Sequence, residues 1–217
     1  AVEVGVLCNN ASLALPAGRS NGESSGTDAV DAGDEDGVTD GEIAAPSGTG
    51  DPIEVALLAL GHTYGIERKQ LVSELREVRE EAFDSDIKMM ATYHAFKKGY
   101  LVAVKGAPEA VLEACTHEAR GWKGTDAGAA AGSDIVPATR ELSETSRKAW
   151  AAKNDELASR GMRMLAVALK IAPSVDEAPY ENLILLGFIS FLDPPRKDVR
   201  ESIAQCKRTG LRVLMIT

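Results

Sequence analysis

The stretch KMMATYHAFKKGYLVAVKGAPEAVLEAC, residues 88–115, decides the fold of this chain. Two runs rich in β-branched and aromatic residues, KMMATYHAF and YLVAVK, flank a Lys-Gly turn, which is typical of an antiparallel β-hairpin. From Pro108 the pattern becomes helical, because proline is favoured at the first helical position. Lys105 ends the second run, and Gly106 follows at once, where a small residue lets a ligand approach the backbone. The stretch therefore predicts a hairpin, a helix and a lysine placed to meet an anionic group, such as the phosphate end of a nucleotide.

Two helices are predicted before the hairpin. Asp51 as N-cap, Pro52 at the first helical position and Glu54 three residues after the cap predict a helix that ends at Gly65. The segment IERKQLVSELREV, residues 66–78, predicts a second helix.

The chain after the hairpin alternates between helical and strand patterns. Residues 139–160 have a helical composition that stops at Gly161, and MRMLAVALK at 162–170 then predicts a strand. The apolar run LILLGFISFL at 183–192 predicts a buried strand, and 193–217 predicts a helix followed by another strand. Strand, helix and strand in this order predict a parallel βαβ crossover.

Two segments lack any hydrophobic period. Residues 17–50 are rich in Gly, Ser and Asp, and 120–134 are rich in Gly and Ala. Such compositions favour solvated loops or disordered inserts, so we predict a flexible acidic insert at 17–50.

Composition limits the classes of function. The chain has 217 residues, 44% of them hydrophobic, and a formal net charge of −9. These values suit one good-sized domain, or one domain with part of another, and they disfavour nucleic acid as a partner. Three cysteines are too few and too scattered for a disulfide framework, and they favour a reducing compartment. The chain opens without a methionine, so we expect it to be a piece of a longer protein.

Several familiar site motifs are absent from the sequence. No G-x-x-x-x-G-K-[ST] phosphate loop occurs, and GTGDPI at 48–53 lacks the third glycine of a dinucleotide fingerprint. DEDGVT at 34–39 lacks the hydrophobic strand that a phosphatase nucleophile loop requires. His62, His94 and His117 are scattered, so no metal site is predicted.

Six ordered motifs instead resemble the nucleotide-binding domain of type II P-type cation-transporting ATPases. They are GDPIEVAL at 50–57, FDSDIKMMA at 83–91, KGAPE at 105–109, GMRMLAVA at 161–168, DPPR at 193–196 and the terminal MIT. The opening LCNNASL also resembles that family, and the likeness covers about four-fifths of the chain. In this family the nucleotide domain is inserted into a haloacid-dehalogenase-like phosphorylation domain. The expected fold is therefore α+β, an antiparallel sheet flanked by helices over 1–182, with a hinge and a partial βαβ phosphorylation domain over 183–217.

The resemblance assigns the base-binding residues. Phe83 is expected to stack on adenine, the alternative being a core phenylalanine behind the hairpin. Glu54 is expected to accept a hydrogen bond from the adenine amino group, and a capping box with Asp51 is its other possible role.

The resemblance also assigns a set of cationic and small residues. Lys88, Lys105 and Gly106 are expected to line the same pocket, with Lys105 near the adenine and ribose or reaching toward phosphate. Its alternative is a solvated charge at a strand end. Arg163 is expected to contact the polyphosphate, the alternative being a surface arginine. Many relatives carry an arginine two residues after the stacking phenylalanine, where this chain has Ser85, so one phosphate or ribose contact is in doubt.

The DPPR motif resembles the hinge between the two domains. The residues expected there or near the phosphates are Asp193, Pro194, Pro195, Arg196 and Thr217. Two prolines restrict the crossing backbone, so the movement is expected to be a pivot.

The resemblance implies a function and a setting. No D-K-T-G-T loop occurs in these residues, so no catalytic residue is expected here. The chain is expected to bind ATP and to position it for transfer to an aspartate elsewhere, with Mg²⁺ acting only in the intact enzyme. Its partners would be the phosphorylation, actuator and transmembrane domains of the same polypeptide, and its location the cytoplasmic side of a membrane protein. Calcium is the first expectation for the ion. The alternative is a regulatory or interaction module that uses the acidic insert.

Overall fold

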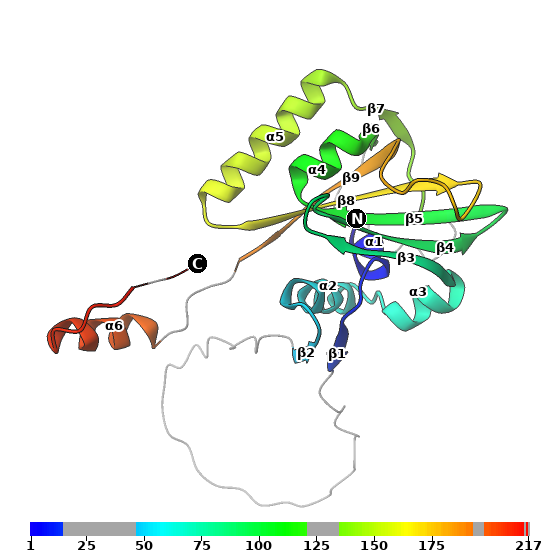
Figure 1. The fold of residues 1–217 in the computed structure, drawn as a ribbon. Helices are drawn as coiled ribbons and strands as arrows, with labels where there is room; N and C mark the ends of the chain where they lie inside the picture. The colour runs from blue at the N-terminus through cyan, green and yellow to red at the C-terminus, as the bar shows by residue number, and fades with distance from the viewer. Residues whose placement is uncertain (15–46, 121–134, 193–197, 215, 217) are drawn as a thin grey trace, which may run out of the picture.

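A seven-stranded sheet organises the chain (Figure 1). The computed structural model describes residues 1–14, 47–120, 135–192, 198–214 and 216. In spatial order the strands are β3 (Glu77–Asp84), β4 (Met89–Phe96), β5 (Gly99–Gly106), β8 (Arg163–Ala172), β9 (Leu183–Phe191), β6 (Cys115–Ala119) and β7 (Thr139–Glu141). Every neighbouring pair is antiparallel except β6 and β9, which run parallel. The predicted α+β class with a mostly antiparallel sheet is confirmed.

The predicted hairpin is confirmed as β4 and β5. Their register runs from Met89 opposite Gly106 to Phe96 opposite Gly99, which leaves Lys97 and Lys98 as the turn. Residues Leu101 and Ala103 of β5 contribute to one hydrophobic core, whereas Val102 and Val104 contribute to the other. Both faces of β5 are buried, which explains why its sequence is a continuous apolar run rather than an alternating one.

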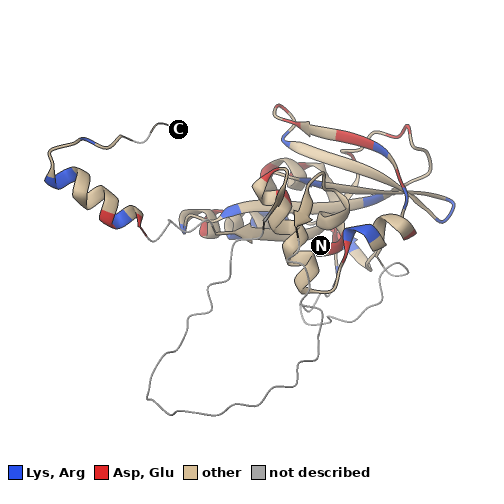
Figure 2. Cartoon of the chain, turned by 90° about the horizontal axis from the view of Figure 1, so that it is seen from below, with Lys and Arg blue, Asp and Glu red and all other residues tan. Residues whose placement is uncertain are grey.

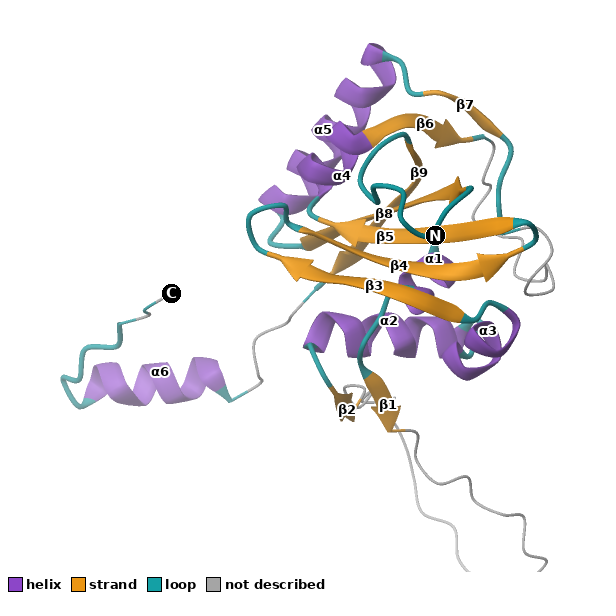
Figure 3. Cartoon of the chain, turned by 45° about the vertical axis from the view of Figure 1, so that its right-hand side comes forward, coloured by secondary structure: helices purple, strands orange, loops and turns teal. Residues whose placement is uncertain are grey.

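Helices cover both faces of the sheet (Figure 3). One core contains buried residues of α1 (Val2–Leu7), α2 (Pro52–Thr63) and α3 (Arg68–Glu74). The other contains residues of α4 (Pro108–Ala114), with Trp150 of α5 (Glu144–Ser159) packed against it. The sheet therefore lies between two helical layers.

The start of α2 follows its sequence signals. Asp51 accepts a hydrogen bond from the backbone N–H of Ile53 at 2.8 Å, and Pro52 is the first helical residue. The predicted second helix is shorter than expected, because α3 ends at Glu74 and the following residues form β3. Glu and Arg favour helices in isolation, but pairing with the exposed edge of β4 overrides that preference.

The end of the predicted insert is ordered, which corrects one boundary. Strand β2 (Ser47–Thr49) pairs with β1 (Ser12–Ala14), although 47–49 fall inside the predicted insert at 17–50. Residues 15–46 lie outside the described residues, as does most of the second predicted insert.

The predicted βαβ crossover over 183–217 is not confirmed, and 193–197, 215 and 217 lie outside the described residues. Strand β9 pairs with β8 and β6, and its Leu183 and Leu185 side chains are buried in the core of the seven-stranded sheet. Helix α6 (Val199–Arg208) follows, but 211–214 do not form a strand. Because β9 completes the sheet, we now propose that the domain boundary follows Phe191 instead of preceding Leu183.

Candidate functional site

The residues expected to bind adenine lie at one end of the sheet. Met90 is opposite Lys105 in the register of β4 and β5. On the other side of β4, a register shift between Glu81 and Asp84 sets Phe83 close to the same row. Neighbouring strands are about 4.8 Å apart, so the backbones of Phe83 and Lys105 are separated by roughly 10 Å across one intervening strand.

Phe83 and Lys105 differ sharply in exposure. Phe83 is 62% exposed, so the alternative role as a core phenylalanine is wrong. Lys105 is only 6% exposed, so it is not a solvated charge at a strand end. An exposed ring at the same end of the sheet as a buried cation is an arrangement that a flat, polar ligand can use.

Lys105 forms a buried ion pair with Glu54. The Nζ of Lys105 lies 2.5 Å from Oε1 of Glu54, and their side chains are 8% and 14% exposed. The other carboxylate oxygen of Glu54 accepts a hydrogen bond from the backbone N–H of Asn10 at 3.2 Å. The carboxylate of Glu54 is therefore used by Lys105 and Asn10, in place of the predicted capping box with Asp51.

Two asparagines attach the N-terminal segment to this pair. Asn9 is fully buried, donates to the backbone oxygen of Glu54 at 2.9 Å and accepts from the N–H of Ala11. Asn10 donates to Oε1 of Glu80 at 2.5 Å. Sequence reasoning assigned no role to Asn10 or Glu80. The adjacent asparagines in LCNNASL were the available signal, because an asparagine side chain offers both donors and an acceptor.

A tight turn carries Lys88. Lys88 N–H donates to the backbone oxygen of Asp84 at 2.6 Å, and Lys88 has a positive φ of 58°. The carboxylate of Asp84 accepts from the N–H of Asp86 at 2.7 Å and from that of Ile87 at 3.3 Å. Asp84 thus closes an Asx turn at the end of β3.

Close packing also requires glycine at position 106. A Cβ atom there would lie 2.4 Å from the backbone oxygen of Lys88 and 2.7 Å from Cγ of Met89. The N–H of the next residue, Ala107, donates to that same Lys88 oxygen at 3.0 Å. Glycine is needed here so that the turn carrying Lys88 can pack against the end of β5.

The side chain of Lys88 is held only loosely. It pairs with Glu109 at 3.2 Å, and both side chains are more than half exposed. Hydrogen bonding to its own backbone N–H at the start of α4, and then to Lys88, lowers the pKa of Glu109. Exposed pairs of this kind contribute about 0–1 kcal/mol, so Lys88 can change partners at little cost.

The structure does not place Arg163 next to Phe83 and Lys105. This arginine is exposed, opens β8 and pairs with Phe191 of β9. Lys105 is opposite Val167, so Arg163 lies four residues further along β8, or roughly 13 Å. The expected hinge and phosphate-side residues, Asp193, Pro194, Pro195, Arg196 and Thr217, lie outside the described residues.

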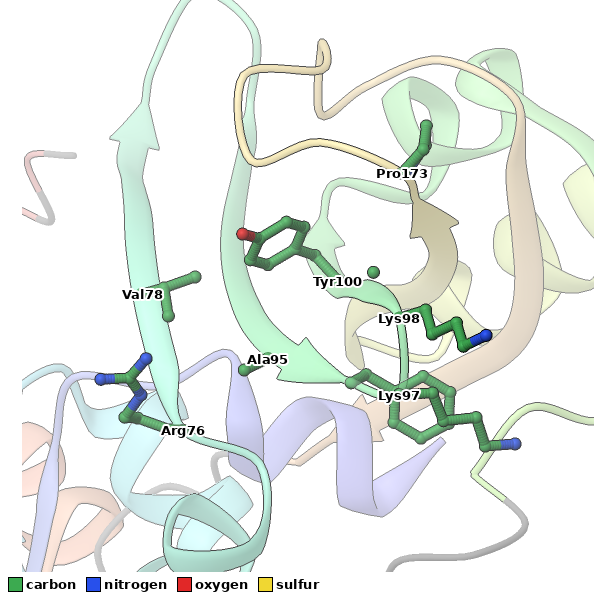
Figure 4. A pocket seen from close by; sticks show the side chains of 9 residues that line it. Arg76, Val78, Ala95, Lys97, Lys98, Tyr100 and Pro173 are labelled. Carbon is green, nitrogen blue, oxygen red and sulfur yellow. The ribbon is translucent and has the colours of Figure 1, made fainter.

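A hollow of about 410 Å³ lies elsewhere, at the tip of the β4–β5 hairpin (Figure 4). It is lined by Arg76, Lys97, Lys98, Tyr100 and Pro173, among others. In Figure 4 the guanidinium of Arg76 lies on the opposite side of the view from the amines of Lys97 and Lys98. This hollow and the Phe83–Lys105 row are at opposite ends of the hairpin, so the hollow is not part of the predicted site.

Other chemistry finds little support in the described part of the chain. Burial raises the pKa of Cys8 to about 11 and that of Cys115 to about 12, so both thiols stay protonated at neutral pH. No cluster of three or more His, Cys, Asp or Glu side chains suited to a metal ion occurs among the described residues. In Figure 2, basic and acidic segments are interspersed along the ribbon. Among the helices that the structure describes, none combines the length and apolar composition needed to cross a bilayer.

The fold and this cluster define an α+β domain with an exposed aromatic ring and a buried Lys–Glu pair at one end of its sheet. The family model for the cytoplasmic domain N of P-type ATPases matches residues 1–198. The chain therefore belongs to the P-type cation ATPase family.

Curated relatives agree with this family. The chain is 35% identical over 174 residues to calcium-transporting ATPase 1 of Bacillus cereus. This alignment covers 79% of the present chain and 18% of the relative. The chain is 31% identical over 172 residues to calcium-transporting ATPase 1 of Lactococcus lactis, covering 77% and 18%. It is also 30% identical over 190 residues to the sodium/potassium-transporting ATPase subunit alpha of Hydra vulgaris, covering 78% and 16%. The chain thus spans less than a fifth of the length of these relatives.

Proposed function

We propose that this chain binds ATP at the end of the sheet marked by Phe83, Lys88 and Lys105. The bound ATP is positioned for phosphoryl transfer to an aspartate in another domain of a P-type cation pump. The observation that carries this proposal is the exposed ring of Phe83, one strand away from the buried Lys105–Glu54 pair. An exposed ring offers a face on which a flat base can stack, and stacking removes apolar surface from water.

Adenine is the part of ATP that suits this end of the sheet. In this proposal the adenine ring stacks on Phe83, and its amino group donates to the carboxylate of Glu54 or Glu80. A carboxylate has several acceptor sites, so Glu54 can keep Lys105 and Asn10 as partners and still accept from a ligand. Carboxylates repel phosphate, which makes this the wrong place for the triphosphate.

The triphosphate is proposed to run toward Arg163. That residue lies beyond the end of β5, at the end of β9 from which the chain continues toward 193–196. A guanidinium is a fixed donor for phosphate, and Lys88 can follow the ligand because its own ion pair is exposed. The γ-phosphate would then face the side where a second domain joins the chain.

The proposed contribution of this domain is to position ATP, and the residues that carry out phosphoryl transfer lie in another domain. Holding ATP so that its γ-phosphate meets a nucleophile converts binding energy into proximity. Mg²⁺ is proposed to act in the intact enzyme, where it neutralises charge as the phosphoryl group moves. The proposed partners are the phosphorylation, actuator and transmembrane domains of the same polypeptide, with this domain on the cytoplasmic side of the membrane.

Calcium is the proposed ion, because the two bacterial relatives described above are named calcium-transporting ATPases. A different class of function, a regulatory module acting through the acidic insert, would leave the Phe83 end of the sheet without a ligand. An ATP titration distinguishes the two proposals.

The test is a titration of the ¹⁵N-labelled chain with ATP, followed by amide chemical shifts. We expect saturable shifts around Phe83, Lys88 and Lys105, with a dissociation constant in the high micromolar to millimolar range, about −4 to −6 kcal/mol. Phe83→Ala should weaken binding by roughly 5- to 150-fold, since ring stacking on a base is worth about 1–3 kcal/mol. Ile87→Ala, which removes another exposed apolar side chain from the same turn, is the matched control and should bind as the wild type does.

Two outcomes would contradict the proposal. The first is an absence of shifts at millimolar ATP in a chain that remains folded. The second is equal affinity of the Phe83→Ala variant and the wild type, which would remove the stacking role.

A further inference from the structure

We propose that Asp84 is a positioning residue of the nucleotide site, acting through the turn that joins Phe83 to Lys88. This inference rests on the proposed function and names a residue that neither the sequence motifs nor the family resemblance assigned. Asp84 need not touch the ligand. Its role is to hold the backbone of Phe83 and of the turn that leads to Lys88 in the conformation that binds the ligand.

The ring of Phe83 lacks a rigid setting of its own. At 62% exposure it has few neighbours that could fix its orientation, so the backbone must do so. Phe83 is followed by Asp84, the last residue of β3, which is paired with Met89. The direction of the ring therefore depends on how the chain turns immediately after β3.

The carboxylate of Asp84 fixes that turn. One oxygen, Oδ1, accepts two backbone hydrogen bonds, from Asp86 at 2.7 Å and from Ile87 at 3.3 Å. The backbone oxygen of Asp84 accepts a third, from Lys88 at 2.6 Å. Asp84 is itself exposed, so its side chain has no role in the hydrophobic core. Its contacts serve the turn, and the turn carries two of the proposed ligand contacts.

The same turn is tied to the strand that carries Lys105. The backbone oxygen of Lys88 accepts from Ala107 at 3.0 Å, and Gly106 is opposite Met89. Asp84, Met89 and Gly106 thus form one row across β3, β4 and β5. If the turn became more mobile, Phe83 and Lys88 would both lose their fixed positions relative to Lys105. A ligand that had to reorder this turn would bind more weakly, because ordering costs entropy at the moment of binding.

Two substitutions separate the acceptor oxygen of Asp84 from its charge. Asp84→Ala removes the acceptor, whereas Asp84→Asn keeps an acceptor oxygen and loses the charge. Asp86→Ala is the matched control, because it removes one carboxylate from the same turn but leaves the Asx hydrogen bonds in place. Each variant is titrated with ATP, and hydrogen exchange is measured at the amides of Asp86 and Ile87.

In Asp84→Ala we expect faster exchange at these two amides and ATP binding about five- to tenfold weaker, the loss typical of removing a capping acceptor. In Asp84→Asn and Asp86→Ala we expect both readouts within about twofold of the wild type. The thermal midpoint should stay nearly unchanged in Asp84→Asn and Asp86→Ala, and it should fall by about 2–4 °C in Asp84→Ala, because a capping acceptor is lost there. Recovery in Asp84→Asn would show that the acceptor oxygen of Asp84, and not its negative charge, supports ATP binding.

The inference is overturned if Asp84→Ala loosens the turn and still binds ATP as the wild type does. It is also overturned if Asp84→Asn binds as weakly as Asp84→Ala, since charge would then be the cause. A wild-type chain that showed no ATP shifts would remove the proposed function and this inference with it. Failure of the inference alone leaves wild-type binding and the effect of Phe83→Ala intact.

Discussion

Replacing Lys105 with methionine is expected to destabilise the domain even when no ligand is present. The substitution keeps the length of the apolar stem and removes the ammonium group that lies 2.5 Å from Glu54. The carboxylate of Glu54, 14% exposed, would then keep the backbone N–H of Asn10 as its remaining donor among the described residues. A buried carboxylate without its cation is costly, because the desolvation penalty is no longer offset.

The magnitude follows from the burial of the pair. Removing one partner of a fully buried ion pair costs about 3–5 kcal/mol. The hydrogen bond from Asn10 and the partial exposure of Glu54 reduce this to about 2–3 kcal/mol. In a domain of this size each kcal/mol corresponds to about 2–4 °C, so the midpoint should fall by roughly 4–12 °C.

The assay is urea unfolding of four chains that form a double-mutant cycle: the wild type, Lys105→Met, Glu54→Gln and the double variant. The double variant should lose less stability than the sum of the single losses, by about 1–2 kcal/mol, because glutamine still accepts from Asn10 and leaves no buried charge. Lys88→Met, which breaks the exposed pair with Glu109, should stay within about 0.5 kcal/mol of the wild type. Additive losses, or a Lys105→Met variant as stable as the wild type, would refute the reasoning. The same measurement shows how much of any ATP-binding defect at Lys105 comes from loss of folded protein.

Three further predictions concern pH, a buried network and the metal. Burial lowers the pKa of His94, whose Nδ1 lies 2.9 Å from the backbone oxygen of Leu75. Below about pH 6.5 the unfolded chain therefore binds more protons than the folded chain, and the free energy of unfolding should decrease as the pH is lowered, by up to about 1.4 kcal/mol per pH unit. A His94→Gln variant whose free energy of unfolding has the same dependence on pH would contradict this. Glu118 accepts hydrogen bonds from Arg140, Ser146 and Trp150, so Glu118→Ala should cost roughly 2–4 kcal/mol in urea unfolding, and a loss below about 0.5 kcal/mol would argue against the network. ATP should bind with and without Mg²⁺ at affinities within about threefold, about 0.7 kcal/mol, as measured by titration; strict dependence on Mg²⁺ would count against the proposed site.

Local sequence signals were sufficient for the elements whose stabilising contacts are local. Asp51 and Pro52 begin α2 as expected, and the β4–β5 hairpin closes at Lys97 and Lys98 within one residue of its predicted turn. Caps and turns act over a few residues, so their residue types can be read without knowing the rest of the fold.

Sequence reasoning failed where distant pairing decided the structure. The charged segment of β3 favours a helix by propensity, yet it forms an edge strand because β4 offers unpaired backbone groups. The run LILLGFISFL was correctly predicted as a strand, but only part of it is buried and its predicted parallel βαβ partner is not confirmed. A buried run looks the same in a parallel crossover and in the middle of an antiparallel sheet.

The candidate site divides in the same way. Glu54, Phe83, Lys88 and Lys105 came from motifs, and their roles toward ATP stay predictions. The ion pair between Lys105 and Glu54, and the bond from Asn10 to Glu80, join residues 51 and 70 positions apart. By itself the sequence determined the family, the hairpin and the chemical types available. Only the tertiary structure decided which carboxylate pairs with Lys105 and which residues fix the turn beside Phe83, because contacts across strands depend on register and on chain packing rather than on neighbouring residues.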